Sequence, residues 1–348
     1  MVIVARPPHP GETVPTTRFA RWRIFAPLFL AVLVAVAACG GAASGKQVSI
    51  VAYSVPKPAY DAVTAAFEKT AAGKNVSFKA SYGASGDQSR AVVAGQPANY
   101  VAFSIEPDMT KLVPKFVDAS WASGPTHGLV SESVVVLAVR KGNPKHIEGW
   151  DDLTKPGVKI VTPDPGSSGS AKWNILGAYT HVLEEGGTEA QAQAYLKQFF
   201  AHVVAKPESG SKATQTFLNG TGDVLISYEN EAIQSRAKGL PLDYIVPKFS
   251  IRIENPAAVT KNAPRAAKDF LAYVESKQGQ TVFASKGYRP VLAGIDPGKV
   301  TGANDPSNPF PQVAKLATIQ DLGGWAVVNE KYFDPTTGIV TKLEGSSG

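Results

Sequence analysis

Short apolar runs alternate with amphipathic segments through most of the chain. Apolar runs at 48–53, 76–80, 100–105 and 134–139 are flanked by polar residues and have the length of buried strands. Between them, apolar residues recur at helical spacing, as with Val63, Ala66 and Phe67 after Pro58. Strands that alternate with helices at this spacing predict an open α/β sheet that is mostly parallel.

A second α/β series follows residue 140, with apolar runs at 159–161, 223–228 and 242–246 and helical patterns at 189–203 and 264–287. The chain has 348 residues, enough for about two domains. We therefore expect two lobes, each a mostly parallel sheet flanked by helices, with a cleft between them. The predicted boundaries place lobe I at 47–132 and 243–300, lobe II at 133–242, and a loop, helix and tail packed on the lobes at 301–348.

The first 46 residues have the composition of an export signal. Arg18, Arg21 and Arg23 precede an apolar stretch at 24–38, which is shorter than the roughly 20 residues of a membrane-spanning helix. Small residues then precede Cys39, the one cysteine of the chain, and the arrangement resembles a bacterial lipobox. We predict a signal peptide at 1–38, a lipidated Cys39 and a flexible tether at 39–46, which would hold the protein outside the cell on the membrane. The alternative is an uncleaved anchor with a free cysteine.

The charge pattern argues against one class of partner. The formal net charge is +6, and the segment before Cys39 contributes half of it. No run of Lys and Arg with interleaved aromatic residues is present, so we do not expect nucleic-acid binding.

Three junctions between a strand and a helix are rich in Ser and Gly. They lie at 81–88, 162–174 and 209–215. The first N–H groups of a helix have no intrahelical partner, and the helix dipole adds partial positive charge there, so such a junction can bind an anion without a basic residue. In open α/β sheets, ligands bind beyond the carboxyl ends of the strands, where all three junctions fall. We expect them to converge on one small anion. Each junction is also compatible with an ordinary helix cap.

Several short motifs stand out along the chain. They are Tyr82-Gly-Ala-Ser-Gly-Asp-Gln88, Arg140-Lys-Gly-Asn-Pro144, Asp151-Asp-Leu153, Lys155-Pro-Gly-Val158, Thr162-Pro-Asp-Pro165, Ser168-Gly169, Trp173-Asn174, Gly222-Asp-Val-Leu225, Glu229-Asn-Glu-Ala232 and Tyr288-Arg-Pro290. Together they resemble the motifs of the sulfate-binding proteins of bacterial sulfate/thiosulfate ABC importers. The resemblance covers roughly residues 47–333. It implies a two-lobed periplasmic-binding-protein fold of type II, a monomer without enzyme activity, metal or cofactor, that delivers sulfate or thiosulfate to an ABC permease and its ATPase.

The resemblance also implies the site residues. Backbone N–H groups, Ser hydroxyls and an indole bind the anion in this family without a counter-cation. By position, these donors fall on Ser85, on Ser168, Gly169 and Ser170, and on a backbone group near Ser211.

The chain departs from the family pattern at several of these positions. Tyr228 stands where the family commonly has Trp, Ser54 follows the first strand where it has Asp, and Ser170 replaces a Gly. We include Tyr228 and Ser54 among the candidate ligands. The third junction is one residue shorter, which makes the placement on Ser211 the least direct.

Other functions stay open at this point. Another tetrahedral oxyanion, such as thiosulfate, molybdate or phosphate, suits similar donors, and the carboxylate of Asp87 would accept the proton of hydrogen phosphate. An exported serine hydrolase is an alternative because Ser209 and Lys212 form Ser-x-x-Lys, although the accompanying motifs are missing. A structural lipoprotein is a third class.

Overall fold

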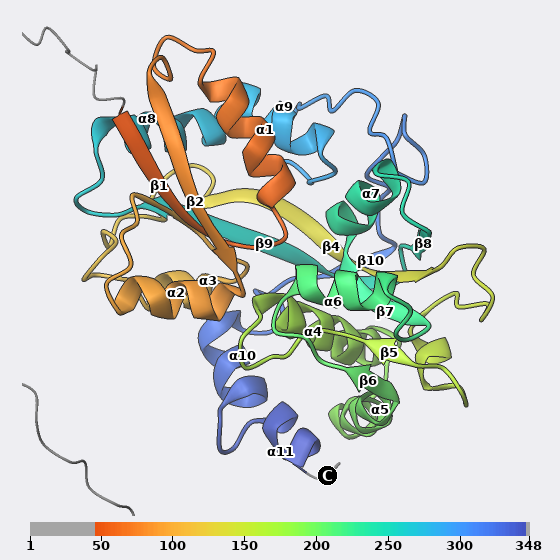
Figure 1. Cartoon of the computed structure of the whole chain (residues 1–348). Helices are drawn as coiled ribbons and strands as arrows, with labels where there is room; N and C mark the ends of the chain where they lie inside the picture. Colours follow the sequence, from red (N-terminus) through yellow and green to blue (C-terminus); the bar gives the residue numbers. More distant parts are fainter. Residues whose placement is uncertain (1–45, 346–348) are drawn as a thin grey trace, which may run out of the picture. The chain divides into compact units, whose positions relative to one another are not determined.

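The computed structural model describes residues 46–345, and these residues form one compact unit (Figure 1). The strands are β1 (Lys46–Tyr53), β2 (Val76–Gly83), β3 (Tyr100–Ala102), β4 (Leu129–Arg140), β5 (Ile160–Val161), β6 (Val203–Ala205), β7 (Val224–Tyr228), β8 (Leu242–Ile245), β9 (Phe249–Val259) and β10 (Lys315–Ala317). The helices are α1 (Lys57–Phe67), α2 (Ser85–Val93), α3 (Glu106–Thr110), the 3-10 helix η1 (Trp150–Thr154), α4 (Gly169–Glu184), α5 (Glu189–His202), α6 (Gly210–Leu218), α7 (Glu229–Ala237), α8 (Arg265–Glu275), α9 (Lys277–Ser285), α10 (Gly324–Phe333) and α11 (Ile339–Gly345).

The strands form one mixed sheet in the order β2-β1-β3-β9-β4-β7-β5-β6, with β10 beside β9 and β8 beside β4. The outer strands of each half run parallel, as predicted, because helices connect them. The long strands β4 and β9 run antiparallel to each other and to β7 and β3. The fold is the predicted two-lobed periplasmic-binding-protein-like α/β fold, and the two long strands connect its halves.

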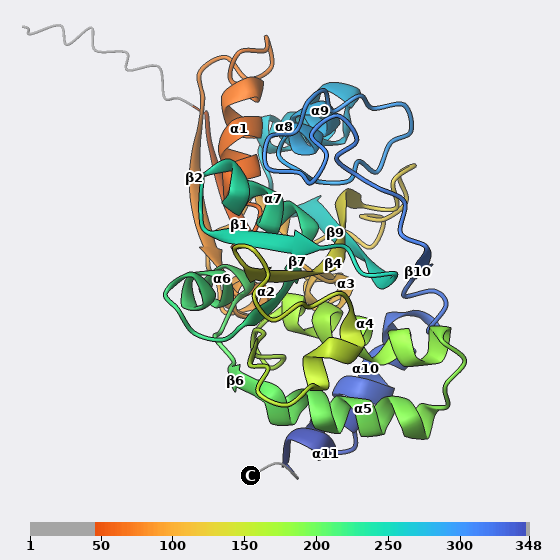
Figure 2. The ribbon, with the colours of Figure 1, turned by 90° about the vertical axis from the view of Figure 1, so that its right-hand side faces the viewer.

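Helices cover both faces of each half of the sheet. Side chains of β4 alternate: Val135, Leu137 and Val139 pack with α4 and α5, whereas Val134 and Val136 pack with α6 and α7. The apolar run at 134–139 is therefore buried on both faces, as its composition predicts. In the other half, α1, α8 and α9 lie on one face of β1 and α2 and α3 on the opposite face (Figures 1 and 2).

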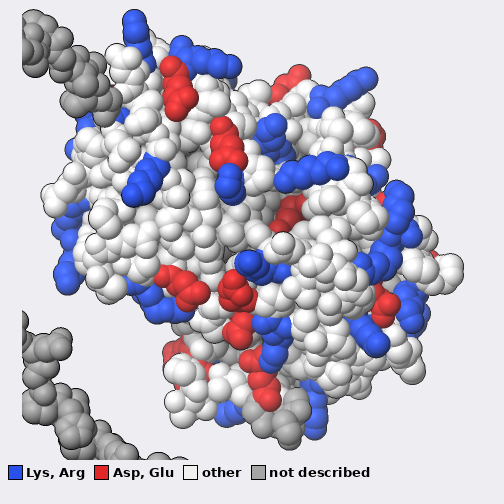
Figure 3. Space-filling view, viewed as in Figure 1, with Lys and Arg blue, Asp and Glu red and all other residues white. Residues whose placement is uncertain are grey.

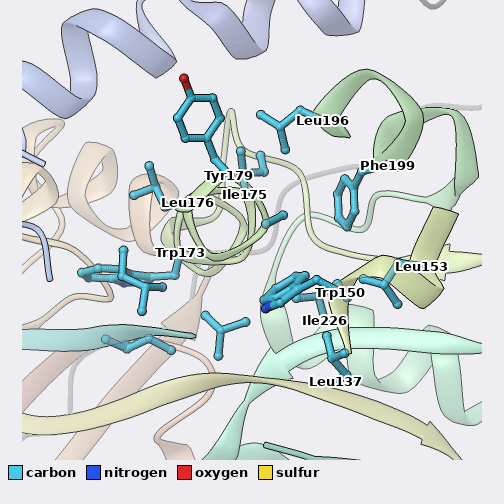
Figure 4. Packing of buried hydrophobic residues seen from close by; sticks show 14 of the residues in the cluster. Leu137, Trp150, Leu153, Trp173, Ile175, Leu176, Tyr179, Leu196, Phe199 and Ile226 are labelled. Atoms are coloured by element: carbon cyan, nitrogen blue, oxygen red, sulfur yellow. The ribbon is translucent and has the colours of Figure 1, made fainter. Parts of the chain in front are cut away.

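The largest core cluster surrounds α4. Trp150, Leu153 and Phe199 pack on one side of this helix, and Trp173 points to another (Figure 4). The C-terminal helices α10 and α11 add Trp325 and Val340 to the same cluster. Helices α10 and α11 thus pack on the core, and α4 is held from several directions.

Two details differ from the predictions, and a third bears on a predicted boundary. The helical pattern at 264–287 forms two helices, because Ser276 adopts an extended backbone and its hydroxyl accepts from the N–H of Gly279 at 3.2 Å. The central strand β9 was not predicted, since its middle carries the charged Arg252 and Glu254. The predicted boundary at 132/133 falls inside β4, and the lobe boundaries stay predictions.

Two of the sequence motifs bind each other. The guanidinium of Arg289 donates to both carboxylate oxygens of the buried Glu229, at 2.7 and 3.0 Å. Two other motifs are joined by Arg140, which begins the motif at 140–144 and donates to the carbonyl of Gly222, the first residue of the motif at 222–225. Arg140 also donates to the carbonyl of Phe217. These motifs stabilise the fold around the site, because their charged groups are paired within the protein.

Among the described residues, no helix is both long and apolar enough to cross a membrane. On the face seen in Figure 3, basic and acidic side chains are interspersed.

Candidate anion-binding site

Three helices begin at one small cavity. The N-termini of α2, α4 and α6 reach it from different parts of the chain, and the ends of β1 and β2 and the residue Ser104 after β3 complete its wall. Its walls lie close together: about 140 Å³ of empty space separates the wall atoms, and none of it is wide enough for a water molecule. Its lining residues are Tyr53, Ser54, Gly83, Ala84, Ser85, Ser104, Ser168, Ser170, Ser209 and Gly210. The three Ser/Gly junctions therefore converge, as the sequence predicts.

The start of α4 offers the most donors. Ser168 is the N-cap residue and is buried, yet its hydroxyl makes no capping hydrogen bond. The N–H groups of Gly169 and Ser170 belong to the first turn and have no intrahelical partner. A Cβ atom at Gly169 would lie 2.6 Å from Ser104 Oγ, so only glycine fits there. This turn presents a hydroxyl and backbone N–H groups at the cavity.

The hydroxyl of Ser85 is engaged within the protein. It donates to Asp108 Oδ2 at 2.7 Å and accepts from the N–H of Ser104 at 3.0 Å. A hydroxyl has one proton, so Ser85 Oγ does not donate to the cavity while it bonds to Asp108. The N–H of Ser85 is the first of α2 and has no intrahelical partner. At this junction the structure offers a backbone donor.

Tyr228 is fully buried and is not one of the residues that line the cavity, but it contacts the lining residue Ser104. Its phenol lies 2.7 Å from Ser104 Oγ, and either oxygen can be the donor. Burial raises the pKa of the Tyr228 phenol above its ordinary value, so the phenol keeps its proton at neutral pH. Trp173 Nε1 donates to the carbonyl of Ser104 at 2.8 Å, and the N–H of Gly86 donates to Ser167 O at 3.0 Å. These bonds hold the two halves together around the cavity.

The remaining predicted residues are Ser54 and Ser211, and only the first of them lines the cavity. Ser54 lines the cavity at the end of β1. At the third junction, Ser209 and Gly210 line the cavity, whereas Ser211 is the second residue of α6 and is not part of the wall. The side chain of Ser209 accepts from the N–H of Lys212, which leaves the N–H groups of Gly210 and Ser211 without an intrahelical partner.

None of the described residues that line the cavity has a charged side chain. Asp87, the carboxylate that phosphate would need, lies on the exposed side of α2 and pairs with Arg90. Burial raises the pKa of Tyr53, so this phenol also stays neutral. Neutral donors and helix N-termini are therefore the groups that meet a ligand here.

Sequence reasoning missed Ser104. This serine is fully buried: its N–H donates to Ser85 Oγ, its hydroxyl bonds to the phenol of Tyr228, and its carbonyl accepts from Trp173 Nε1. The rule that located the other residues also applies to it, because it follows the apolar run of β3 at the carboxyl end of that strand.

The fold and the site define a solute-binding protein. Residues 48–289 match the family of bacterial extracellular solute-binding proteins, and the chain belongs to this family. Among its relatives, a sulfate-binding protein of Synechococcus elongatus is 38% identical over 88% of this chain and 92% of its own length. A thiosulfate-binding protein of Pseudomonas aeruginosa is 33% identical over 88% of this chain and 95% of its own length.

A solved structure shows the same fold. The sulfate-binding protein SubI from Mycobacterium tuberculosis H37Rv aligns with 83% of this chain and 100% of its own, at 42% identity and a TM-score of 0.78. The resemblance found in the motifs is confirmed by these relatives, which are named as binding proteins and not as enzymes. The predicted signal peptide and Cys39 lie outside the described residues.

Proposed function

We propose that the protein is an extracytoplasmic lipoprotein that captures sulfate and delivers it to an ABC permease. The observation that carries the proposal is the convergence of three helix N-termini and several serines on one uncharged cavity. The names of the relatives support sulfate as the ligand.

The proposed donors are uncharged. They are the N–H groups of Ser85, Gly169, Ser170 and Ser211 and the hydroxyls of Ser54, Ser168 and Tyr228. When Ser104 donates to Tyr228, the phenolic proton is left for the anion. Hydrogen bonds to a charged group contribute about 1.5–3 kcal/mol each, so about seven of them offset the desolvation of a dianion and the entropy cost of binding.

Donor groups alone also give selectivity. Sulfate carries no proton at neutral pH and accepts at every oxygen. Hydrogen phosphate brings a proton that would face another donor, which is unfavourable in a buried site. The position of Asp87 outside the cavity leaves no carboxylate to accept that proton.

Thermal unfolding of residues 46–348 tests the ligand. The protein is refolded free of anions and heated with sulfate, thiosulfate, molybdate, phosphate or chloride at matched ionic strength. A ligand at 100 times its Kd stabilises by about 2.7 kcal/mol, which raises the Tm by a few degrees. We expect sulfate to raise it and phosphate and chloride to leave it unchanged. A shift with phosphate alone, or with none of the anions, would refute the proposal.

Thiosulfate is the second candidate ligand, because a thiosulfate-binding protein is among the relatives. Calorimetric titration with each anion, followed by displacement of one by the other, ranks the two.

The lipid anchor is tested separately in cells. Full-length protein should incorporate labelled fatty acid and sediment with membranes, and Cys39→Ala should do neither. A variant protein that is still labelled would place the modification on another residue.

A further inference from the structure

A second polar cluster lies at the far end of α4. His181 is in the last turns of this helix, Glu185 is its C-cap residue, and Asp151 belongs to η1. One nitrogen of His181 and one carboxylate oxygen of each acid lie within 4.8 Å of one another. His181 and Glu185 are four residues apart, a spacing that places both side chains on one face of the helix.

The imidazole of His181 is held rigidly. Its ring stacks on Trp150 at 5.7 Å and 17° and meets Tyr195 edge-on at 4.3 Å (Trp150 is labelled in Figure 4). Nδ1 lies 2.6 Å from the carbonyl of Ala178. A carbonyl only accepts, so Nδ1 carries a proton and Nε2 is the nitrogen that faces the two acids.

Nε2 has no hydrogen-bond partner among the described residues, although His181 is only 2% exposed. The nearest oxygen of Asp151 is 3.8 Å away, which is beyond hydrogen-bond length. A buried polar atom without a partner is costly, and such an atom often marks a missing ion or water.

We propose that Asp151, His181 and Glu185 bind a divalent transition-metal ion of the Zn²⁺ type. One imidazole nitrogen and two carboxylates form a ligand set that Zn²⁺ accepts, with a fourth position left for water. In metal sites, a ligating histidine usually donates its other ring N–H to a carbonyl or a carboxylate, and the bond from His181 Nδ1 to the carbonyl of Ala178 is of this kind. A buried imidazole selects against Ca²⁺ and Mg²⁺, which prefer oxygen ligands.

The carboxylates can adjust to the ion. Ligands of a tetrahedral Zn²⁺ with bonds near 2.0 Å lie about 3.3 Å apart. Both acids are exposed, and the side chain of Asp151 is 78% accessible, so the required movement meets little obstruction.

The local electrostatics favour a cation. No Lys or Arg of the described chain forms an ion pair with Asp151 or Glu185. Lys155 pairs instead with Asp152, and Lys315 lies beside Glu184. The C-terminal end of a helix carries partial negative charge, which stabilises a cation near its last turn. The same helix begins at the anion cavity, about 18 Å away by its rise per residue.

Calorimetric titration of residues 46–348 with ZnCl₂ tests the site, with CaCl₂ and MgCl₂ as comparisons. We expect one Zn²⁺ per chain and no comparable binding of Ca²⁺ or Mg²⁺. Asp151→Asn and Glu185→Gln should each weaken the binding at least tenfold. Glu184→Gln, a change of the same kind at the adjacent residue, should leave it within twofold.

His181→Gln should abolish the binding, and unfolding curves of the exposed Asp151 and Glu185 variants show whether a loss reflects misfolding. Co²⁺ gives a second readout, since a four-coordinate ion in this site produces a visible absorption band that disappears in Asp151→Asn. Absence of Zn²⁺ binding, or equal binding by Asp151→Asn, Glu185→Gln and Glu184→Gln, would overturn the proposal. Sulfate affinity is measured on the same samples. A loss of Zn²⁺ binding with unchanged sulfate affinity, or the reverse, then shows which of the two proposed sites is wrong.

Discussion

Replacement of Ser168 by alanine separates the affinity of the site from the stability of the fold. The hydroxyl of an N-cap serine normally accepts from the first turn, and its loss costs about 0.5–2 kcal/mol of stability. Here the hydroxyl makes no capping bond and lies at the cavity. Ser168→Ala therefore removes a group that the folded protein does not use for itself.

The size of the effect follows from the charge of the ligand. A hydrogen bond to a charged group contributes about 1.5–3 kcal/mol, which corresponds to a roughly 10- to 150-fold increase in the Kd for sulfate. The free energy of unfolding without ligand should change by less than about 0.5 kcal/mol, because no internal hydrogen bond is lost.

Calorimetric titration with sulfate at fixed ionic strength gives the Kd, and urea unfolding of the ligand-free protein gives the stability. Ser167→Ala is the matched control, since the hydroxyl of Ser167 donates to the carbonyl of Glu208 and not to the cavity. A Kd that changes less than threefold in Ser168→Ala would refute the assignment. A loss of stability above 1 kcal/mol with unchanged affinity would show that the hydroxyl is a helix cap.

Three further predictions concern neighbouring groups. Gly169→Ala places a Cβ atom 2.6 Å from Ser104 Oγ, so sulfate affinity should fall at least tenfold in the same titration; unchanged affinity would contradict the close approach. Ser85→Ala removes the donor to the buried Asp108 and should lower the free energy of unfolding by about 1–3 kcal/mol, and a loss below 0.5 kcal/mol in urea would contradict this role. Burial lowers the pKa of Lys172 to about 8. Above that pH the folded state binds fewer protons than the unfolded state, so stability should rise by about 2 kcal/mol between pH 8 and 9.5 relative to Lys172→Met; a constant difference between the two proteins would refute this.

The sequence predicted the convergence of the three junctions because strand ends and helix starts follow from local patterns. Ser85 and Ser168 lie in Ser/Gly-rich junctions between an apolar run and a helical pattern, and parallel strands bring such junctions to one edge of a sheet. The motifs themselves were enough to identify the family.

The partners of each hydroxyl were not predictable in this way. Ser85 and Ser168 occupy similar positions in sequence, but the hydroxyl of the first bonds to Asp108, whereas the hydroxyl of the second makes no capping hydrogen bond. That difference depends on α3, which packs beside α2 and carries Asp108 in a segment without a motif of its own. The antiparallel strand β9 was missed for a related reason, since its role is set by pairing with β4, more than a hundred residues earlier.

The uncharged wall of the cavity has a thermodynamic consequence. Because the side chains that line the site, Tyr53 included, carry no charge near neutral pH, an incoming dianion changes the net charge of the protein by its full two units, and no proton is taken up or released to compensate. The heat of binding at pH 6 should then be the same in buffers of different ionisation enthalpy. The emptied protein is left without a buried, unpaired charge, so release of the anion carries no electrostatic penalty of that kind.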